Sequence, residues 1–231
     1  MVGPRVAGRR KIKAVELDYP FHGRCLVQNS PANRIPSHGT DRFGTTFAID
    51  FVPVDQENRS ARFSARSLWR PEAPEKFIGF GQPVLSPVAG SVALAFDGSE
   101  DHHAYRGFPS VGHALTQARR TTAGWGALAG NYVAIQESRS GHYVVLCHLR
   151  HGSISVHLGQ DIQIGVQVAE FGNSGNSTEP HVHVQAVDAL DFVRAVSLPL
   201  SFPSGLPRNG QIVDGRPPDS GQDAVQPPSI V

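Results

Sequence analysis

Two histidines, His181 and His183, stand two residues apart in a short segment with the character of a β-strand. Side chains in a strand alternate between its two faces, so both imidazoles project from the same face. Two nitrogen donors on one face supply half of the ligand set that zinc takes in proteins. The pair alone is equally compatible with packed or solvated histidines, so the remaining donors have to come from other parts of the chain.

Asp50 and His38 are the candidates for those donors. Asp50 lies in the alternating run 47–52, on the face opposite Ile49 and Phe51, where an unpaired carboxylate would be costly to bury. His38 lies in a loop just upstream. Zinc held by two imidazoles and one carboxylate keeps a fourth position for water and lowers the pKa of that water, as catalytic zinc sites do. The alternatives are an aspartate that accepts backbone hydrogen bonds at a turn and a histidine on the surface.

His148 lies in a further strand-like run, Tyr143–Leu149. We expect it to share a face with Leu146, and we expect Cys147 to point to the opposite face as a small core residue. If this strand neighbours the one that carries His181, the two histidines flank the open coordination position. One could then accept the proton of the water and the other could stabilise the developing oxyanion. A lone strand histidine is more often packed or solvated, so the joint occurrence carries this hypothesis.

The other histidines lack such neighbours, and we interpret them as surface residues. Three belong to an irregular segment in the middle of the chain, His102, His103 and His113, and four are scattered, His22, His142, His151 and His157.

Composition favours a single β-rich domain. The 231 residues suffice for one well-filled domain. The 24 glycines and 18 prolines suit many short strands and turns. With only Cys25 and Cys147 as cysteines, a disulfide scaffold is not expected. The formal net charge of +1 argues against a nucleic-acid or membrane-surface partner recognised through bulk charge.

The pattern of apolar residues predicts a mainly β fold, a single antiparallel β-sheet or barrel-like domain with little helix and two long loop insertions. The densest strand signal is a hairpin candidate formed by Asn131–Gln136 and Tyr143–Leu149. We divide the chain into an N-terminal edge strand with its lead-in segment (1–28), a β-domain (29–212) with insertions at 55–80 and 97–130, and a flexible tail (213–231).

Several motifs together resemble the lysostaphin-like zinc metallopeptidases, the M23 peptidases that cut peptide cross-links of bacterial cell walls. Ala48–Pro53 is similar to that family's Gly-Ile-Asp-Phe strand. The matching segments that follow in the expected order are Gly81–Val92, Gly130–Ile135, Cys147–Leu149, Val156–Gln160, Phe171–Thr178 and Pro180–His183. The resemblance covers most of the chain from His38 to about Val187, outside the two insertions.

The resemblance implies a zinc ion on His38, Asp50 and His183, with catalytic roles for His148 and His181. It also implies a lysostaphin-like, barrel-like β core (duplicated hybrid motif) with the site in a groove between loops.

This sequence departs from the family pattern in two places. Twelve residues separate His38 from Asp50, more than the family usually has, so His38 must return to the metal through a longer loop. Asp41 is nearer in number, but it lacks the flanking strand pattern, and Asp50 is preferred. Leu146-Cys147 stands where the family often has Tyr-Ala, so a phenol that could assist at the oxyanion is absent there.

The expected function is that of a zinc-dependent endopeptidase hydrolysing amide bonds in the cross-link or stem peptides of peptidoglycan. The alternative is a non-catalytic metal-binding relative that acts as a binding or regulatory module. A third class, a phosphohistidine or swinging-arm carrier β-domain, needs no aspartate ligand and has less support. Residues 1–19 are basic without an apolar run, so we expect no secretory signal in them and no membrane-spanning segment. That indicates a cytoplasmic protein, whereas the resemblance suggests the cell envelope or secretion.

Overall fold

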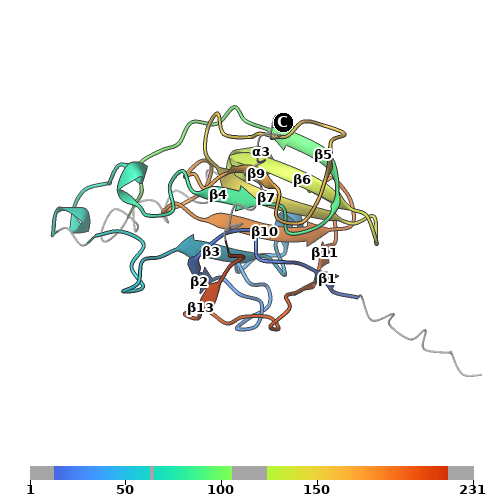
Figure 1. Cartoon of the computed structure of the whole chain (residues 1–231), viewed down its shortest axis with the longest axis horizontal. Coiled ribbons are helices and arrows are strands. Elements are labelled where there is room, and N and C mark those ends of the chain that lie inside the picture. The colour runs from blue at the N-terminus through green and yellow to red at the C-terminus, as the bar shows by residue number, and fades with distance from the viewer. Residues whose placement is uncertain (1–12, 63–64, 106–123, 218–231) are drawn as a thin grey trace, which may run out of the picture.

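The computed structural model describes residues 13–62, 65–105 and 124–217, and these form a mainly antiparallel β-structure around one long curled sheet (Figure 1). The sheet has nine strands in the order β13-β2-β3-β10-β7-β6-β5-β8, with β11 added beside β10. Its strands are β2 (Arg24–Gln28), β3 (Ile49–Pro53), β5 (Gly90–Phe96), β6 (Asn131–Glu137), β7 (Tyr143–Leu149), β8 (Asp161–Ile162), β10 (Val182–Val187), β11 (Ser197–Leu198) and β13 (Ile212–Asp214). The predicted β-rich fold class with little helix is confirmed.

Two short strand pairs complete the β-structure of the described residues. An antiparallel ribbon is formed by β4 (Pro83–Leu85) and β9 (Gln167–Glu170), and a parallel pair by β1 (Val15–Glu16) and β12 (Leu200–Ser201). The helices in these ranges are short: η1 (Arg42–Gly44), η2 (Ala65–Leu68), η3 (Pro74–Lys76) and α3 (Trp125–Ala129). Within the part that the structure describes, no helix has the length and apolar character to cross a bilayer.

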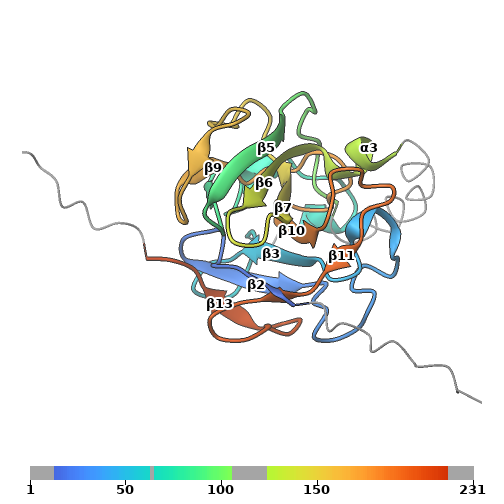
Figure 2. The same cartoon turned by 90° about the vertical axis from the view of Figure 1, so that its right-hand side faces the viewer.

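The main core lies between one face of the sheet and the β4–β9 ribbon. Period-two alternation places Ile49 and Phe51 of β3 and Val184 of β10 on this face, together with Val84 and Val168 from the ribbon. Figure 2 shows β9 on one side of the strands of the sheet and α3 on the other. The sheet face opposite this core is therefore free to carry polar side chains.

A smaller apolar cluster covers part of that opposite face. It contains Val145 and Cys147 of β7 and Val187 of β10, and Trp125 of α3 packs against it. The indole of Trp125 stacks on Phe192 with ring centroids 3.6 Å apart. This cluster holds α3 beside the part of the sheet face that carries Asp50 and His183.

The hairpin predicted in the middle of the chain is present as β6–β7. β2 is not an edge strand, because it pairs with β3 on one side and with β13 on the other. The edge strand β13 includes the first residues of the predicted tail, where Ile212 and Val213 provide a short apolar pair. The last residues, 218–231, lie outside the described part.

The two predicted insertions meet each other. Ala61 and Phe77 of the first form a small apolar cluster with Ala104 of the second, and Glu72 is bridged to Ala104. The first insertion also contains the 3-10 helix η2. Residues 106–123 of the second insertion, including His113, lie outside the described residues.

Candidate metal centre

Three neighbouring strands place the candidate residues in one row across the sheet. Asp50 of β3 is the register partner of His183 of β10, and His183 is in turn the partner of Cys147 of β7. Register partners share a face, so all three side chains lie on the face opposite the main core. Asp50 and His183 are both buried. The alternation in the sequence thus delivers the carboxylate and one imidazole to the same spot.

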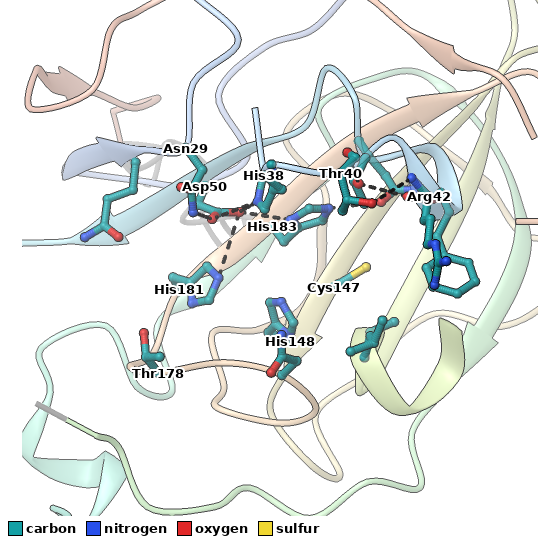
Figure 3. A pocket seen from close by; sticks show the side chains of 18 of the residues that line it. Asn29, His38, Thr40, Arg42, Asp50, Cys147, His148, Thr178, His181 and His183 are labelled. Carbon is teal, nitrogen blue, oxygen red and sulfur yellow. Dashed lines mark hydrogen bonds and ion pairs between the residues drawn. The ribbon is translucent and has the colours of Figure 1, made fainter. Parts of the chain in front are cut away.

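His38 reaches the same spot from its loop, despite the long spacing to Asp50. Its Nε2 lies 3.1 Å from Asp50 Oδ2, and His183 Nδ1 lies 2.9 Å from Asp50 Oδ1. One ligand atom from each of the three residues lies within 4.8 Å of the other two (Figure 3). Ligands bound to zinc at about 2.0–2.2 Å in a tetrahedron lie about 3.3 Å apart, so the spacing suits such an ion.

In each of the two rings, His38 and His183, the nitrogen that points away from Asp50 has its own hydrogen-bond partner. These partners determine which nitrogen of each ring carries the proton. The hydroxyl of Ser37 donates to the carbonyl oxygen of Thr45, so Ser37 Oγ accepts from His38 Nδ1–H at 3.0 Å. On the other ring, His183 Nε2–H donates to Gln185 Oε1 at 3.0 Å.

The orientation of the Gln185 amide is itself fixed. Its Nε2 donates to the carbonyl oxygen of Phe43 at 3.0 Å, which leaves Oε1 to face His183. Both imidazoles therefore turn an unprotonated nitrogen toward the Asp50 carboxylate. Three electron-rich groups face one another with no proton assigned between them, an arrangement that a divalent cation satisfies.

The same contacts perturb the ionisation of the zinc-free protein. Burial on its own raises the pKa of Asp50, but the nearby His38, His183 and His181 outweigh burial and hold this pKa well below its usual value. Burial on its own lowers the pKa of His183, and the Asp50 carboxylate outweighs it, so the pKa of His183 is raised. Without a metal, the Asp50 carboxylate therefore favours the protonated form of His183. Metal binding displaces that proton.

His148 occupies a β-bulge at the end of β7. Asn131 and Tyr132 are consecutive on β6, yet they pair with Leu149 and Cys147, so His148 is the extra residue. It adopts φ = 64°, an uncommon conformation for a residue other than glycine. The bulge turns His148 to the face of Cys147, and both line the same cavity. The prediction that these two side chains point to opposite faces is wrong, because strict alternation stops at the bulge.

His148 and His181 face each other next to the three clustered residues. Their ring centroids lie 4.7 Å apart, and those of His148 and His183 lie 5.9 Å apart. His148 Nδ1 lies 3.0 Å from the carbonyl oxygen of Ser174, and His181 Nδ1 lies 2.8 Å from that of Glu179. A carbonyl only accepts, so each Nδ1 carries the proton and each Nε2 remains for the cavity. Burial, followed by the neighbouring His181 and His183, lowers the pKa of His148 well below its usual value.

A buried polar network fixes the carbonyl that orients His148. Ser174 Oγ donates to the carbonyl oxygen of Leu149 at 2.8 Å and accepts from the backbone N–H of Asn131 at 2.9 Å. Gly130 and Gly175 pack backbone to backbone beneath it, and a Cβ on Gly130 would lie 2.4 Å from Ser174 Oγ. Sequence reasoning missed Asn131, Ser174 and Gln185. For Gln185 a signal existed, since it is polar and follows His183 by two residues on the same strand face.

The five histidine and aspartate side chains line a cavity of about 660 Å³. Its walls also include Trp125, Leu128 and Ala129 of α3, and the loop that carries Thr40 and Arg42. Cys147 contributes to the floor of this cavity, and burial together with Asp50 raises the pKa of its thiol above the usual value. A cavity of this size holds a few residues of an extended peptide.

None of the other histidines that the structure describes is brought to this centre. His103, His151 and His157 are exposed, as expected. His22, His102 and His142 are half-buried. His102 has a structural contact that the surface interpretation did not include: its Nε2 lies 3.0 Å from the carbonyl oxygen of Gly175 and ties the second insertion to the loop below His148.

Comparison with known proteins gives a family match in the second half of the chain. The model of Peptidase family M23 matches residues 111–193, which include His148, His181 and His183. The match confirms the resemblance to M23 peptidases and supports a peptidase. His38 and Asp50 lie outside the matched residues, and the fold alone brings them to His183.

Among solved structures, similarity is found to several peptidases of low identity. The catalytic domain of the antimicrobial peptidase lysostaphin from Staphylococcus simulans has 16% identity and a TM-score of 0.38, over 80% of this chain and 88% of that one. A putative peptidase M23 from Pseudomonas aeruginosa has 17% identity and a TM-score of 0.40, over 85% and 53%. A zinc-containing peptidase from Vibrio cholerae has 18% identity and a TM-score of 0.31, over 65% and 45%.

Proposed function

We propose that this chain is a zinc-dependent endopeptidase in which His38, Asp50 and His183 hold the ion and His148 and His181 serve the reaction. The observation that carries the proposal is the direction of the two ring nitrogens. Their N–H groups are engaged by Ser37 and Gln185, so two lone pairs converge on a buried carboxylate. A buried carboxylate that faces two nitrogen lone pairs needs a positive partner, and a divalent cation supplies it.

A zinc ion in this position would polarise the carbonyl of a scissile amide and lower the pKa of a water molecule. The chain itself supplies proton transfer and orientation. His148 and His181 each hold their Nδ1 proton against a backbone carbonyl, so each Nε2 presents a lone pair that can accept a proton. The rings lie 4.7 Å apart, and the one that has taken the proton of the water on its Nε2 can then donate a hydrogen bond to the developing oxyanion or pass the proton to the leaving amine.

We propose that the substrates are cross-link or stem peptides of peptidoglycan. The support is the match to a peptidase family together with the resemblance to its wall-cutting members. An enzyme with this substrate acts in the cell envelope or outside the cell, and we propose that location for the protein.

The test combines metal analysis with turnover. Protein purified without chelator is expected to hold one zinc per chain and to release new amino groups from purified peptidoglycan. His183→Ala is expected to lose both zinc and turnover. The matched control His157→Ala, at an exposed turn position, is expected to keep both. A folded wild-type protein that takes up no zinc would refute the metal centre. Zinc without turnover on any wall preparation would favour the non-catalytic binding module instead.

A further inference from the structure

The loop between His38 and Asp50 forms a fixed wall of the cavity. The carbonyl oxygen of Phe43 accepts a hydrogen bond from Gln185, and Gly44 (φ = 74°) packs so closely that a Cβ there would lie 2.3 Å from Val187 Cγ1. The backbone N–H of Phe47 donates to Ser197 Oγ at 3.1 Å. This loop contains the additional residues that make the separation of His38 and Asp50 longer than is usual in the family that the sequence resembles. The backbone of this loop is therefore held in place beside the candidate metal centre.

Two arginines of this region line the cavity. Arg42 lies in the loop itself, in η1. Arg34 precedes His38, and its Nε donates to the carbonyl oxygen of Ser37 at 2.9 Å, which fixes the guanidinium next to the loop. Both side chains are exposed. Neither forms an ion pair with another described residue, whereas other exposed arginines do so: Arg59, Arg139, Arg150, Arg194 and Arg216.

The carboxylates of the cavity lie elsewhere. Asp50 is already engaged by His38, His183 and the side-chain amide of Asn29. Glu179, which follows Thr178 and lines the cavity, accepts a hydrogen bond from Ser60 of the first insertion. Figure 3 shows Arg42 on one side of the histidines and Thr178 on the other. The cavity is therefore cationic at the Arg42 end and anionic at the Glu179 end.

From this polarity we infer that Arg42 and Arg34 bind a carboxylate of the peptide substrate, on the side of the scissile bond that faces the His38–Asp50 loop. The inference rests on the proposed peptidase function and specifies its substrate class. A guanidinium presents a planar pair of N–H donors that matches a carboxylate, and Glu179 disfavours the same group at the opposite end. The carboxylate is either the free C-terminus of the peptide or an acidic side chain near the cleaved bond.

Matched peptides test the inference and separate the two sources. A peptide that the zinc-loaded protein cleaves is prepared with a free C-terminus or a C-terminal amide, and with Glu or Gln at each position flanking the cleaved bond. The wild type is expected to prefer one carboxylate form by about tenfold in kcat/KM. The double variant Arg34→Ala, Arg42→Ala is expected to bring that ratio close to one, and Arg42→Glu to invert it. Arg139→Ala, at the β6–β7 turn, should keep the wild-type ratio.

Binding of the same peptide pairs, measured by calorimetry on zinc-loaded protein, gives a readout that does not depend on turnover. A wild type without preference in either measurement, or a double variant that keeps the preference, overturns the inference. If the zinc-loaded protein cleaves no wall peptide, the same pairs are made from a peptidoglycan stem peptide; preferential binding of the carboxylate form then supports carboxylate recognition and overturns the peptidase proposal. Zinc content measured on every variant excludes loss of the metal as the cause.

Discussion

Gln185 offers a sharp test of how the candidate centre is held, because its amide makes two buried contacts with opposite roles. Its Oε1 accepts from His183, and its Nε2 donates to the carbonyl oxygen of Phe43. Gln185→Met keeps nearly the same volume and removes both hydrogen bonds. His183 Nε2 and the Phe43 carbonyl then lose their partners, and the ring no longer has a fixed tautomer.

The expected magnitudes follow from these two losses. A buried polar group left without a partner costs about 1–3 kcal/mol, and Phe43 is half-buried and can recover a bond to water. We expect a loss of about 2–4 kcal/mol in the free energy of unfolding, or about 5–12 °C in Tm for a domain of this size. The zinc Kd should rise about 10- to 100-fold, as when other groups that orient a metal-bound histidine are removed.

The assay is competition for zinc with a chromophoric chelator, with thermal unfolding followed by circular dichroism on the same samples. Gln185→Glu separates the two bonds, since its carboxylate still accepts from His183 but cannot donate to Phe43. It should bind zinc at least as tightly as the wild type while unfolding at a lower temperature. A folded Gln185→Met protein whose zinc Kd stays within about twofold of the wild type would refute the reasoning.

Three further predictions address the surroundings of the centre. His148→Ala should keep zinc and lose about 10²–10⁴-fold in kcat, measured by metal content and initial rates; joint loss of zinc would instead make it a ligand. Gly130→Ala, with φ = 66° and a Cβ that would lie 2.4 Å from Ser174 Oγ, should cost about 1–3 kcal/mol and reduce kcat. Its control Gly152→Ala has φ = 71° and nothing within 4 Å, so it should lower Tm without a comparable effect on kcat. Partial burial raises the pKa of Glu137, but the hydrogen bonds that its carboxylate accepts in the hairpin turn outweigh burial and lower it. The stabilisation by Glu137 is therefore complete above the unfolded pKa of about 4.3 and is lost as pH falls through the lower folded pKa. Glu137→Gln should lower Tm by about 2–6 °C at neutral pH, and melting curves should show this difference narrowing below about pH 4.

Local alternation explains what could be predicted from the sequence. Period-two patterns assign Asp50 and His183 to one face of their strands and Ile49 and Phe51 to the other, and the structure has them so. The hairpin follows from two apolar runs joined by a short polar segment. These features depend on residues close in the chain, which a sequence displays directly.

Features that depend on distant contacts could not be predicted in this way. The bulge at His148 is stabilised by Ser174 and by the contact of Gly130 with Gly175, which come together only in the folded sheet. Nothing in the residues around His38 shows that its loop returns to Asp50; a position just upstream made His38 a candidate donor, and the family resemblance implied its role as a ligand. The orientation of Gln185 depends on Phe43, which lies 142 positions away.

The donors of the candidate centre come from strands far apart in the chain, and this spacing links metal uptake to the completion of folding. Asp50 and His183 are separated by 133 positions, so a bound ion would tie the early and late parts of the sheet together across β3 and β10. An unfolded chain closes a loop of that length only at a large entropic penalty and so holds the ion weakly. Zinc would then protect the native protein against unfolding and proteolysis, with a stabilising free energy that grows with the logarithm of the zinc concentration. A nascent chain still lacking β10 could not acquire it.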